Sequence, residues 1–424
     1  MDLLLKNATY IDWRTLEFRE THILVTGGTN GAIRFTDKFP EEKDYETLDC
    51  TGKYVTKSFA VGHHHAYSAL ARGMPAPEKL PQNFLEILQY IWWSLDKALD
   101  RESIKASALV TAMACAKAGA TFVIDHHASP NSIEGSLNII AEAFEEVGIS
   151  HLLCYEISDR DGIEKAEAGL SETGNYLQKK QGLVGLHASF TVGNETLKKA
   201  AEMMEKMQSG IHIHVAEDLL DEEDSRKKYG KRVIERLNDY GILNSQKTIL
   251  AHCLHLDEKE RELVRISKAW VVENMESNLN NNVGYFNGNG LGERIMLGTD
   301  GMHSDMLRSA QQAYFAGQRF DNIDFRAAYA RLRNVHKYLS HNGFSGDGEN
   351  NLVVLDYPTP TPFNKENFLS HFIFGLSSCH VRDVISSGKL IVRDKKLLTV
   401  NEEEINGFSK EQALHLWSKM ISGK

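Results

Sequence analysis

Residues 121–155 read TFVIDHHASPNSIEGSLNIIAEAFEEVGISHLLCY, and this stretch contains the pattern that decides the fold. Two short apolar runs, 121–125 and 151–155, flank a segment in which apolar residues recur at helical spacing. The apolar face of that segment consists of Ile133, Leu137, Ile140, Phe144 and Val147. Ser132 is its expected N-cap, and Gly148 is expected just past its end. The stretch therefore predicts two parallel strands joined by a crossover helix.

The same alternation of apolar runs and helical segments continues on both sides of this unit, from about residue 55 to residue 300. The expected strands are Tyr54–Gly62, Thr121–Asp125, His151–Tyr155, Leu183–His187, Ile211–Val215, Thr248–His252, Trp270–Asn274 and Ile295–Thr299. Eight β/α repeats in one domain predict the α/β class and a TIM-like (β/α)8 barrel, with an open doubly wound sheet as the alternative.

The two ends of the chain have a different pattern, with short β-like runs separated by turns. These runs are Leu3–Ile11, His22–Thr26 and Gly31–Phe35 near the N-terminus, and Asp383–Ser386, Lys389–Val392 and Leu397–Val400 near the C-terminus, before a helix at Lys410–Ser422. Neither set can bury a sheet face alone, so we expect them to pair into one small β-sandwich.

The expected domain organisation follows from these patterns. Residues 1–54 form the N-terminal part of the sandwich, residues 55–360 the barrel, and residues 361–424 the C-terminal part of the sandwich with the terminal helix. Residues 339–366, rich in Gly, Asn and Pro, are expected to be a connector or a mobile loop.

Composition excludes several classes of protein. The 424 residues contain 48 basic and 58 acidic side chains, for a net charge of −10, without a basic run that would bind nucleic acid. No apolar stretch reaches about 18 residues, so no membrane span is expected. The five cysteines are scattered without a C-x-x-C pair and the N-terminus lacks the apolar region of a signal peptide, which predicts a cytoplasmic protein with reduced thiols.

Histidines and an aspartate follow several of the expected strands, at the barrel edge where active sites lie. His63 and His65 are two residues apart in a strand and therefore point to the same face. Taken alone, this run fits a surface loop or a polar strand end as well as a metal site. With His214 and Asp300 at the ends of two other strands, the set predicts one divalent metal ion, Zn²⁺ first and Fe²⁺ second.

Three further polar residues lie near strand ends. Glu217, three residues after His214, can reach a substrate beside the metal, although the acidic residues that follow it also fit a solvated loop. His252 is a catalytic candidate or a strand terminus bonded to backbone, and His187 is a candidate for the pocket wall.

Arginines and aromatic residues extend the set of candidates. Arg72 and Arg160 can bind a carboxylate or a purine carbonyl, although exposed arginines are usually solvated. Phe84, Trp92 and Trp93 can line the pocket or form an oligomer contact, and core packing is their commoner use. We expect a small-molecule substrate and a homo-oligomer, a dimer.

Five segments, in their order and spacing, resemble the amidohydrolase superfamily: Ala60–His65, His214–Glu217, Ala251–Leu256, Glu276–Asn278 and Gly298–Gly301. The resemblance is to the branch that contains guanine, adenosine-type and cytosine deaminases and the triazine chlorohydrolases. Within it the chain looks most similar to the aminohydrolases linked to selenium-dependent purine catabolism, on the segments Ile124–Ser129, Tyr155–Gly162 and Leu186–Thr191.

This resemblance implies a mononuclear metal held by His63, His65, His214 and Asp300. Asp300 would also transfer a proton from water to the leaving group, and His252 would orient the attacking group or stabilise developing charge. Glu217 would protonate a ring or amidine nitrogen, which favours deamination with release of ammonia. The alternatives are hydrolysis of a ring amide or halide, and a non-catalytic metal-binding homologue.

Two departures from the family pattern affect the expected site. Lys57-Ser58 and Val61 stand where family members commonly carry Pro-Gly and Asn, and Glu273-Asn274-Met275 stands where His-Asn-Pro is more common. A carboxylate at position 273 either changes the charge around a bound substrate or is a buried partner of an Arg or His.

Overall fold

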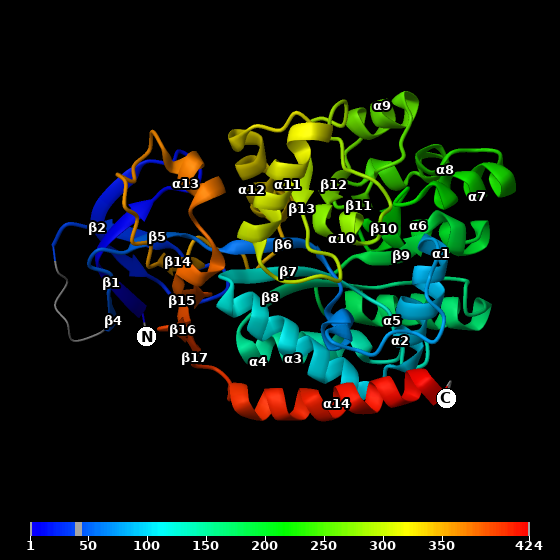
Figure 1. Cartoon of the computed structure of the whole chain (residues 1–424), viewed down its shortest axis with the longest axis horizontal. Coiled ribbons are helices and arrows are strands. Elements are labelled where there is room, and N and C mark those ends of the chain that lie inside the picture. Colours follow the sequence, from blue (N-terminus) through cyan, green and yellow to red (C-terminus); the bar gives the residue numbers. More distant parts are fainter. Residues whose placement is uncertain (1, 39–44, 423–424) are drawn as a thin grey trace.

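The computed structural model describes residues 2–38 and 45–422, and its centre is a parallel barrel (Figure 1). The barrel strands are β6 (Phe59–His64), β7 (Ala120–His127), β8 (Ser150–Tyr155), β9 (Val184–Ala188), β10 (Ile211–Val215), β11 (Ile249–His252), β12 (Trp270–Glu273) and β13 (Ile295–Leu297). Strands β6 to β8 form one parallel group and β9 to β13 another. Bridges between Ile157 and Leu186 and between His64 and Asp300 join the two groups into a ring. The predicted (β/α)8 barrel is therefore confirmed over the doubly wound alternative.

Helices that connect the strands surround the barrel. They are α3 (Arg101–Lys117), α4 (Ser136–Val147), α5 (Ile163–Leu177), α6 (Asn194–Lys206), α7 (Leu219–Tyr229), α8 (Val233–Asp239), α9 (Glu258–Ile266), α10 (Met275–Asn280), α11 (Met306–Phe320) and α12 (Phe325–His341), with single turns η4 (Ser189–Thr191) and η5 (Ile242–Asn244).

Helix α4 tests the amphipathic pattern from which the fold was inferred. Leu137, Ile140, Phe144 and Val147 are buried, and Gly148 ends the helix at φ 95°, as expected. The expected cap at Ser132 is wrong, because the helix begins after Gly135. There the Glu172 carboxylate accepts the backbone N–H groups of Gly135 and Leu137 and replaces a local cap.

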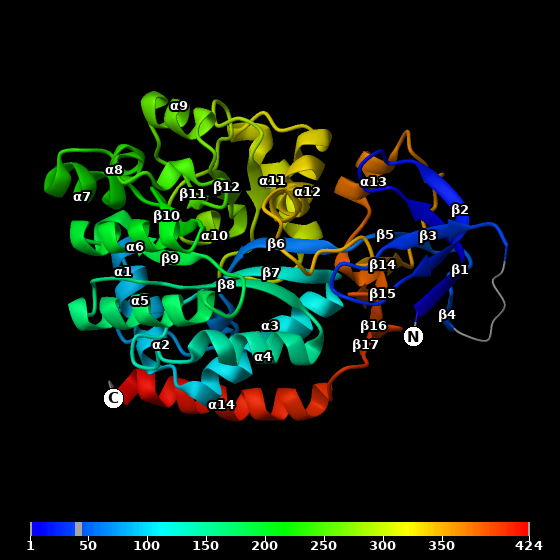
Figure 2. The ribbon, with the colours of Figure 1, turned by 180° about the vertical axis from the view of Figure 1, so that it is seen from behind.

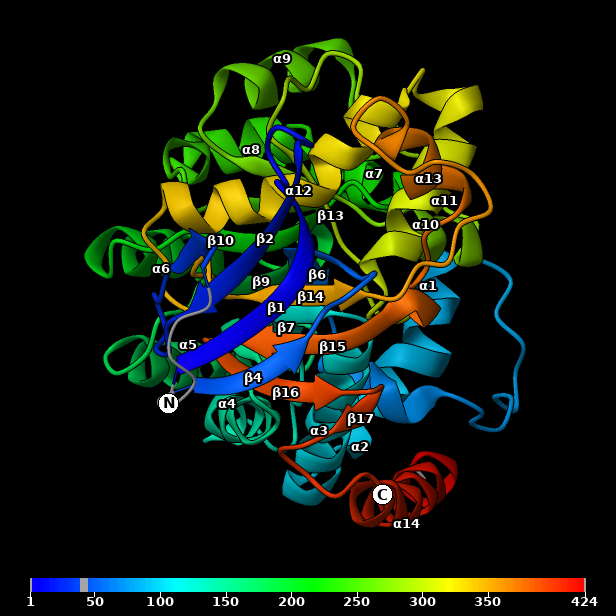
Figure 3. The same cartoon turned by 90° about the vertical axis from the view of Figure 1, so that its left-hand side faces the viewer.

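Both ends of the chain build a second, nine-stranded sheet beside the barrel (Figure 3). Its strands are β1 (Asp2–Ile11), β2 (Phe18–Val25), β3 (Ile33–Thr36), β4 (Tyr45–Asp49), β5 (Tyr54–Lys57), β14 (Leu352–Leu355), β15 (Val381–Ser386), β16 (Lys389–Arg393) and β17 (Lys396–Leu397). Leu3, Ile23, Leu352 and Ile385 belong to one buried cluster. Residues from both ends therefore share a core, as the sequence predicted.

The boundaries between this sheet and the barrel differ from the expected ones. The run 54–62 is not one strand: it breaks at Ser58, whose N–H donates to the Asn351 carbonyl, and β5 before the break pairs with β1 and β14. Strand β14 also corrects the expectation of a loop at 339–366, since Leu352–Leu355 is buried in the sheet. Strand β4, which the sequence analysis missed, pairs in parallel with β1.

A helical segment between β6 and α3 covers one part of the barrel mouth. It consists of η2 (Ala66–Ala71), α1 (Phe84–Ile87), the π-turn η3 (Leu88–Trp92) and α2 (Trp93–Ala98). The C-terminal helix α14 (Glu402–Ser422), which begins earlier than the expected Lys410, lies alongside α2 and α3 in both views (Figures 1 and 2). Helix α13 (Phe368–Phe374) and the turn η6 (Ser378–His380) connect β14 to β15 of the terminal sheet.

Candidate metal centre and active site

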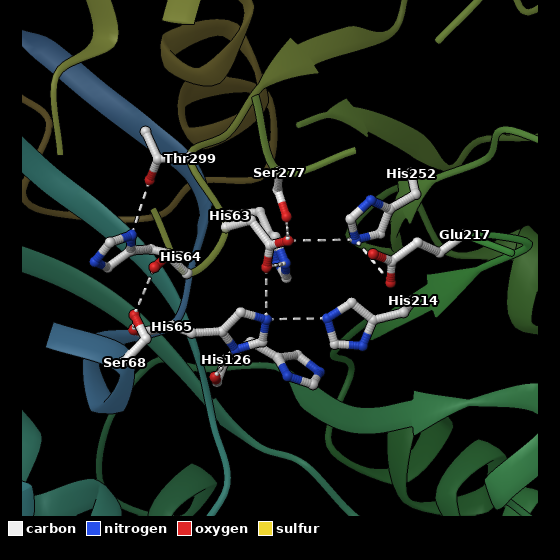
Figure 4. Close-up of polar contacts among 12 residues, drawn as sticks. His63, His64, His65, Ser68, His126, His214, Glu217, His252, Ser277 and Thr299 are labelled. Atoms are coloured by element: carbon white, nitrogen blue, oxygen red, sulfur yellow. Dashed lines mark hydrogen bonds and ion pairs between the residues drawn. The ribbon is translucent and has the colours of Figure 1, made fainter. Parts of the chain in front are cut away.

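Four side chains predicted from three strand ends meet at the carboxyl end of the barrel; Figure 4 shows the three histidines among them. The Nε2 atom of His65 lies 3.1 Å from Nε2 of His214 and 3.0 Å from Oδ1 of Asp300. The Nε2 atom of His63 lies 3.5 Å from the same Oδ1 atom. All four residues are buried. The barrel therefore brings together the whole predicted set.

The hydrogen bonds of the histidines show that this set fits a cation. The Nδ1 atoms of His65 and His214 lie 2.6 Å and 2.8 Å from backbone carbonyls, of His126 and His187, so each donates its proton there. In the neutral rings both Nε2 atoms then direct lone pairs toward each other and toward the Asp300 carboxylate. These lone pairs and the carboxylate oxygen repel one another unless a positive charge lies between them. Ligands at about 2.0 Å from a tetrahedral ion lie about 3.3 Å apart, close to the spacing here.

The third ring, that of His63, is oriented by residues beneath the centre. Its Nδ1 atom lies 2.8 Å from Nε2 of His212, whose Nδ1 atom lies 3.6 Å from the Cys154 sulfur. The Cys154 thiol donates to the Asp125 carbonyl, so the chain of donors runs from His63 through His212 to the sulfur. His63 then presents a bare Nε2, which has no hydrogen-bond partner in the described chain.

Burial keeps two of the three rings, those of His63 and His214, in the neutral form that metal binding requires. It lowers the pKa of His63 to about 3 and lowers the pKa of His214 well below its ordinary value. For His65 burial also lowers the pKa, but the Asp300 carboxylate raises it more, to about 9. The space between His65 and Asp300 therefore favours a positive charge.

Asp300 has one oxygen toward the histidines and one toward a second group of side chains. Oδ2 accepts a hydrogen bond from the Ser277 hydroxyl and lies 3.9 Å from Nε2 of His252. The Nδ1 atom of His252 is held 2.7 Å from the Asn278 side-chain oxygen, so its Nε2 atom faces Asp300 and Glu217. Asp300 can therefore face the metal with one oxygen and exchange a proton with the other.

Glu217 lies beside His252 rather than in solvent. Its Oε2 atom is 3.5 Å from Nε2 of His252, its Oε1 atom accepts from Asn281 at 3.4 Å, and 13% of its side chain is exposed. Burial raises its pKa to about 7. The acidic run that follows is also not a solvated face, because Asp221 is buried and accepts the N–H groups of Ala216 and Phe190.

The backbone around this group adopts conformations that side chains disfavour. Ala216, His252 and Asp300 have φ values of 45°, 73° and 50°. Such left-handed residues cost about 1–3 kcal/mol each and are concentrated at functional sites. Gly298 allows the close packing beneath, since a Cβ there would lie 2.3 Å from the Asn274 side-chain oxygen. The strand ends are strained where the chain turns the side chains of His252 and Asp300 toward the cluster.

The centre opens into a cleft whose empty space, counted together with the open solvent at its mouth, is about 590 Å³. Its lining contains the expected aromatic residues Phe84, Trp92 and Trp93, together with His187 and Arg160. Glu217, Ser277, Asn281 and Asp300 also line it. The structure therefore places the reacting groups and the aromatic wall around the same space.

Two predicted substrate-binding residues lie elsewhere. Glu273 is buried in an ion pair with Arg331, 2.7 Å away, and Arg331 also pairs with Asp321. Glu273 is therefore a structural partner of an arginine, the second of the two expected alternatives. Arg72 follows η2 at the C-cap and is not among the residues that line the cavity.

The sequence analysis missed four residues that shape the site: Glu156, His126, His212 and Asp96. Glu156 directly follows β8 and lines the cavity, so the rule that polar strand ends form the site would have identified it. His212 precedes His214 by two residues on β10, and the shared face of i and i+2 residues was the available signal.

The barrel, the cluster of three histidines and an aspartate, and the buried acid beside them define a metal-dependent hydrolase. The family model "Amidohydrolase family" matches residues 59–345, and the chain belongs to this family.

Two curated relatives cover almost the whole chain. The 5'-deoxyadenosine deaminase of Methanopyrus kandleri is 29% identical, over 92% of this chain and 94% of its own length. A 5-methylthioadenosine/S-adenosylhomocysteine deaminase of Thermoanaerobacter pseudethanolicus is 25% identical, over 96% and 97%.

Solved structures confirm the fold. A zinc-bound adenosine deaminase from Xanthomonas campestris has a TM-score of 0.83 at 19% identity, covering 98% of this chain and 99% of the other. A zinc complex of atrazine chlorohydrolase from Arthrobacter aurescens has a TM-score of 0.81 at 15% identity, covering 97% and 100%. The comparisons thus confirm the family and its deaminase branch, while the link to selenium-dependent purine catabolism stays a prediction.

Among the described residues, no helix combines the length and the hydropathy that crossing a membrane requires.

Proposed function

We propose that this enzyme deaminates an aminopurine nucleoside, by metal-assisted attack of water on the ring carbon that bears the amino group. The observation that carries the proposal is Glu217: a largely buried acid whose pKa is raised by burial to about 7, beside the cluster and on the wall of the cavity. An acid of this kind serves a C=N substrate, because protonation of the ring nitrogen makes the adjacent carbon electrophilic.

His63, His65, His214 and Asp300 would hold the metal, with zinc favoured over iron by the three nitrogen donors and by the zinc-bound structural relatives. A divalent ion at this position would act as a Lewis acid and lower the pKa of water toward neutrality.

Asp300 takes the first proton from the attacking water. Its Oδ2 atom faces Ser277 and His252, so it can then pass that proton to the amino group, which leaves as ammonia. His252 orients the water, since its Nε2 atom has no hydrogen-bond partner in the described chain and faces both carboxylates.

Glu217 gives its proton to the ring nitrogen as the water adds. When the amino group leaves, the remaining hydroxyl proton returns to Glu217, and the product is a ring carbonyl beside a protonated nitrogen. Asn281 holds the carboxyl group of Glu217 through its side-chain N–H. Protons therefore balance over the cycle between Asp300 and Glu217.

The purine nucleoside class is supported by the relatives, whose names specify adenosine derivatives, and by the aromatic wall of Phe84, Trp92 and Trp93. Flat aromatic walls suit a heterocycle through stacking.

Ammonia release from a panel of aminopurine nucleosides, free aminopurines, pterins and amidines tests the proposal. We expect turnover of an aminopurine nucleoside, and its absence in Asp300→Asn, whose amide cannot accept the proton. If none of these compounds releases ammonia, chlorinated triazines assayed for chloride release and ring amides assayed for ring opening test the alternative, and turnover there would support halide or ring-amide hydrolysis. The zinc assignment is tested by elemental analysis of the purified enzyme, where about one equivalent of zinc per chain is expected.

Size-exclusion chromatography with light scattering tests the predicted dimer, and the cytoplasmic location stays a prediction.

A further inference from the structure

A second part of the cavity wall contains charged groups that the proposed reaction does not use. Glu156 follows β8, Arg160 lies four residues further on, His187 ends β9, and Trp93 begins α2. All four line the cavity. We call these four residues the Glu156 wall.

The arginine of this wall is already neutralised. Its guanidinium pairs with Asp96, with Asp161 at 3.0 Å and with Glu156 at 3.7 Å, and it lies over the Trp93 ring at 5.1 Å. Three carboxylates therefore face one guanidinium, and the side chains of Arg160 and Asp96 are 8% and 1% exposed. Two donor groups of Arg160 are bound by carboxylates of the protein, Nε by Asp161 and Nη2 by Asp96, and Nη1 faces Glu156. With three carboxylates around one guanidinium, the group as a whole repels a phosphate or carboxylate of a substrate.

Glu156, in contrast, keeps acceptor capacity. Its Oε1 atom is 3.7 Å from Arg160 and 3.9 Å from Nε2 of His187, and its Oε2 atom is 3.3 Å from Nδ1 of His126. None of these contacts is a hydrogen bond, and His126 Nδ1 has no hydrogen-bond partner in the described chain. The residue is 95% buried, being only 5% exposed. A buried carboxylate without close donors is costly unless a ligand supplies them.

We propose that the Glu156 wall is the specificity site of the enzyme: Glu156 accepts hydrogen bonds from hydroxyl groups of the substrate, and the acids around Arg160 exclude substrates with a phosphate or carboxylate at that position. The substrate class is thus a neutral hydroxylated compound, and with the proposed function it is a nucleoside with a free vicinal diol and no anionic group. The diol part of this inference rests on the proposed function, whereas the exclusion of anions rests on the charges alone.

The first test compares substrates that differ only in the groups facing this wall. We expect kcat/KM to be at least about 100-fold higher for adenosine than for adenosine 5'-monophosphate. Glu156→Gln preserves the shape of the side chain. It should raise KM for adenosine and thereby lower kcat/KM for adenosine by about 10- to 100-fold, whereas kcat/KM for 2',3'-dideoxyadenosine should stay nearly unchanged. Glu164→Gln, in the exposed first turn of α5, is the matched control. An equal loss for both nucleosides in Glu156→Gln would overturn the role of Glu156 in diol recognition.

The second test removes the charge of a carboxylate that pairs with Arg160. Asp161→Asn, at the less buried of the two direct Arg160 partners, and Asp96→Asn should each improve the ratio of kcat/KM for the monophosphate over adenosine, by about 10-fold. An unchanged ratio in both folded variants would overturn the exclusion of anions.

Binding measurements separate this inference from the proposed reaction. Inosine and inosine 5'-monophosphate lack the amino group and cannot be deaminated. Calorimetry with these two compounds therefore measures the effect of the Glu156 wall on binding affinity without turnover. In one outcome no aminopurine reacts, but the wild-type enzyme binds inosine more tightly than inosine 5'-monophosphate, and Glu156→Gln binds inosine more weakly than the wild type does. That outcome would contradict the proposed reaction and support the Glu156 wall as a specificity site. If the enzyme binds the monophosphate as tightly as inosine, or binds neither, the wall is not the specificity site.

Discussion

At the scale of single residues, Glu217 sets the expected pH dependence. Burial raises its pKa to about 7, so the carboxyl group carries its proton below pH 7 and loses it above. Because the protonated form acts as the acid, kcat/KM should fall by about tenfold per pH unit above that midpoint. Glu217→Gln should lower kcat by roughly 100- to 10,000-fold, measured as ammonia release from pH 5 to pH 9.

The metal content of Glu217→Gln serves as the control for this prediction, since Glu217 lies outside the proposed ligand set. Full metal content with lost activity separates proton transfer from metal binding. If the variant kept both its activity and the same alkaline midpoint as the wild-type enzyme, another group would be the acid.

His212 is expected to control metal affinity without touching the metal. It accepts the Nδ1 proton of His63 at 2.8 Å and thereby fixes the tautomer whose Nε2 faces the centre. His212→Phe removes this acceptor and should weaken metal binding by about 10- to 100-fold, measured by competition with a chelator. His151→Phe, at a buried histidine beside Phe144 and away from the centre, should leave the affinity unchanged. Equal affinities in both variants would contradict the role of His212.

The residues of the centre could be predicted because barrel chemistry lies at strand ends, where His63, His65, His214, His252 and Asp300 could all be read from the sequence. Their placement is seen directly in the structure, and their roles remain proposals. What the sequence could not supply is which atoms pair, since a ring such as His212 gains its role from a neighbour 149 residues away. For the same reason Glu273 was ambiguous until Arg331 was found beside it.

At the scale of elements, a buried group of charges fastens the terminal sheet to the barrel. Lys57 at the end of β5 lies 2.9 Å from Asp347, which also pairs with His336 of α12 at 2.8 Å. Lys57 donates further to the carbonyls of Asp347 and Gly348. This contact explains how a lysine is accommodated at this buried position.

Asp347→Asn is expected to lower the free energy of unfolding by about 3–5 kcal/mol at pH 7, because it leaves Lys57 buried without its carboxylate. Burial raises the pKa of Asp347, but His336 and Lys57 lower it more, to about 2, against an ordinary 3.8. The ionised form therefore stabilises the fold fully above about pH 4, and this contribution is lost as the pH falls toward 2.

The difference in stability between wild type and Asp347→Asn should accordingly shrink between pH 4 and pH 2, in urea unfolding with a chelator present so that metal loss does not contribute. Glu167→Gln removes an exposed ion pair with Lys199 and should cost less than about 1 kcal/mol. A difference that is constant from pH 7 to pH 2 would show that Asp347 is not ionised in the folded protein.

Elements with strong periodicity were predictable, as α4 and the eight barrel strands show. Strand β14 was not, because Leu352–Leu355 is a four-residue run within a Gly- and Asn-rich region and acquires its strand partners β5 and β15 only in the folded protein. The break at Ser58 was hidden for the same reason: 54–62 reads as one β-like run interrupted only by Thr56-Lys57-Ser58, and the tertiary pairing divides it between two sheets.

At the scale of the whole molecule, the two ends of the chain support the barrel from different sides. The terminal sheet contacts helix α3 of the barrel through β15, β16 and β17, and α14 lies along α2 and α3 (Figure 2). Helix α2 and the turn η3 contribute Trp92 and Trp93 to the cavity wall. The C-terminal helix is thereby coupled to the shape of the substrate cavity, although it is remote from the metal centre in sequence.

Trp417 is the residue of α14 through which this coupling should act. Its indole N–H donates to the Leu70 carbonyl at 2.9 Å, at the end of η2, which follows His65 directly. Trp417→Ala should therefore make η2 and the α1–α2 segment more mobile. We expect KM to rise several-fold, kcat to stay nearly unchanged, and the free energy of unfolding to fall by about 1–3 kcal/mol. Hydrogen exchange should quicken in residues 84–98. Leu414→Ala on the same helix, at a side chain that is 66% exposed, should change none of these values. Equal exchange rates in residues 84–98 of both variants would show that α14 does not support the cavity wall.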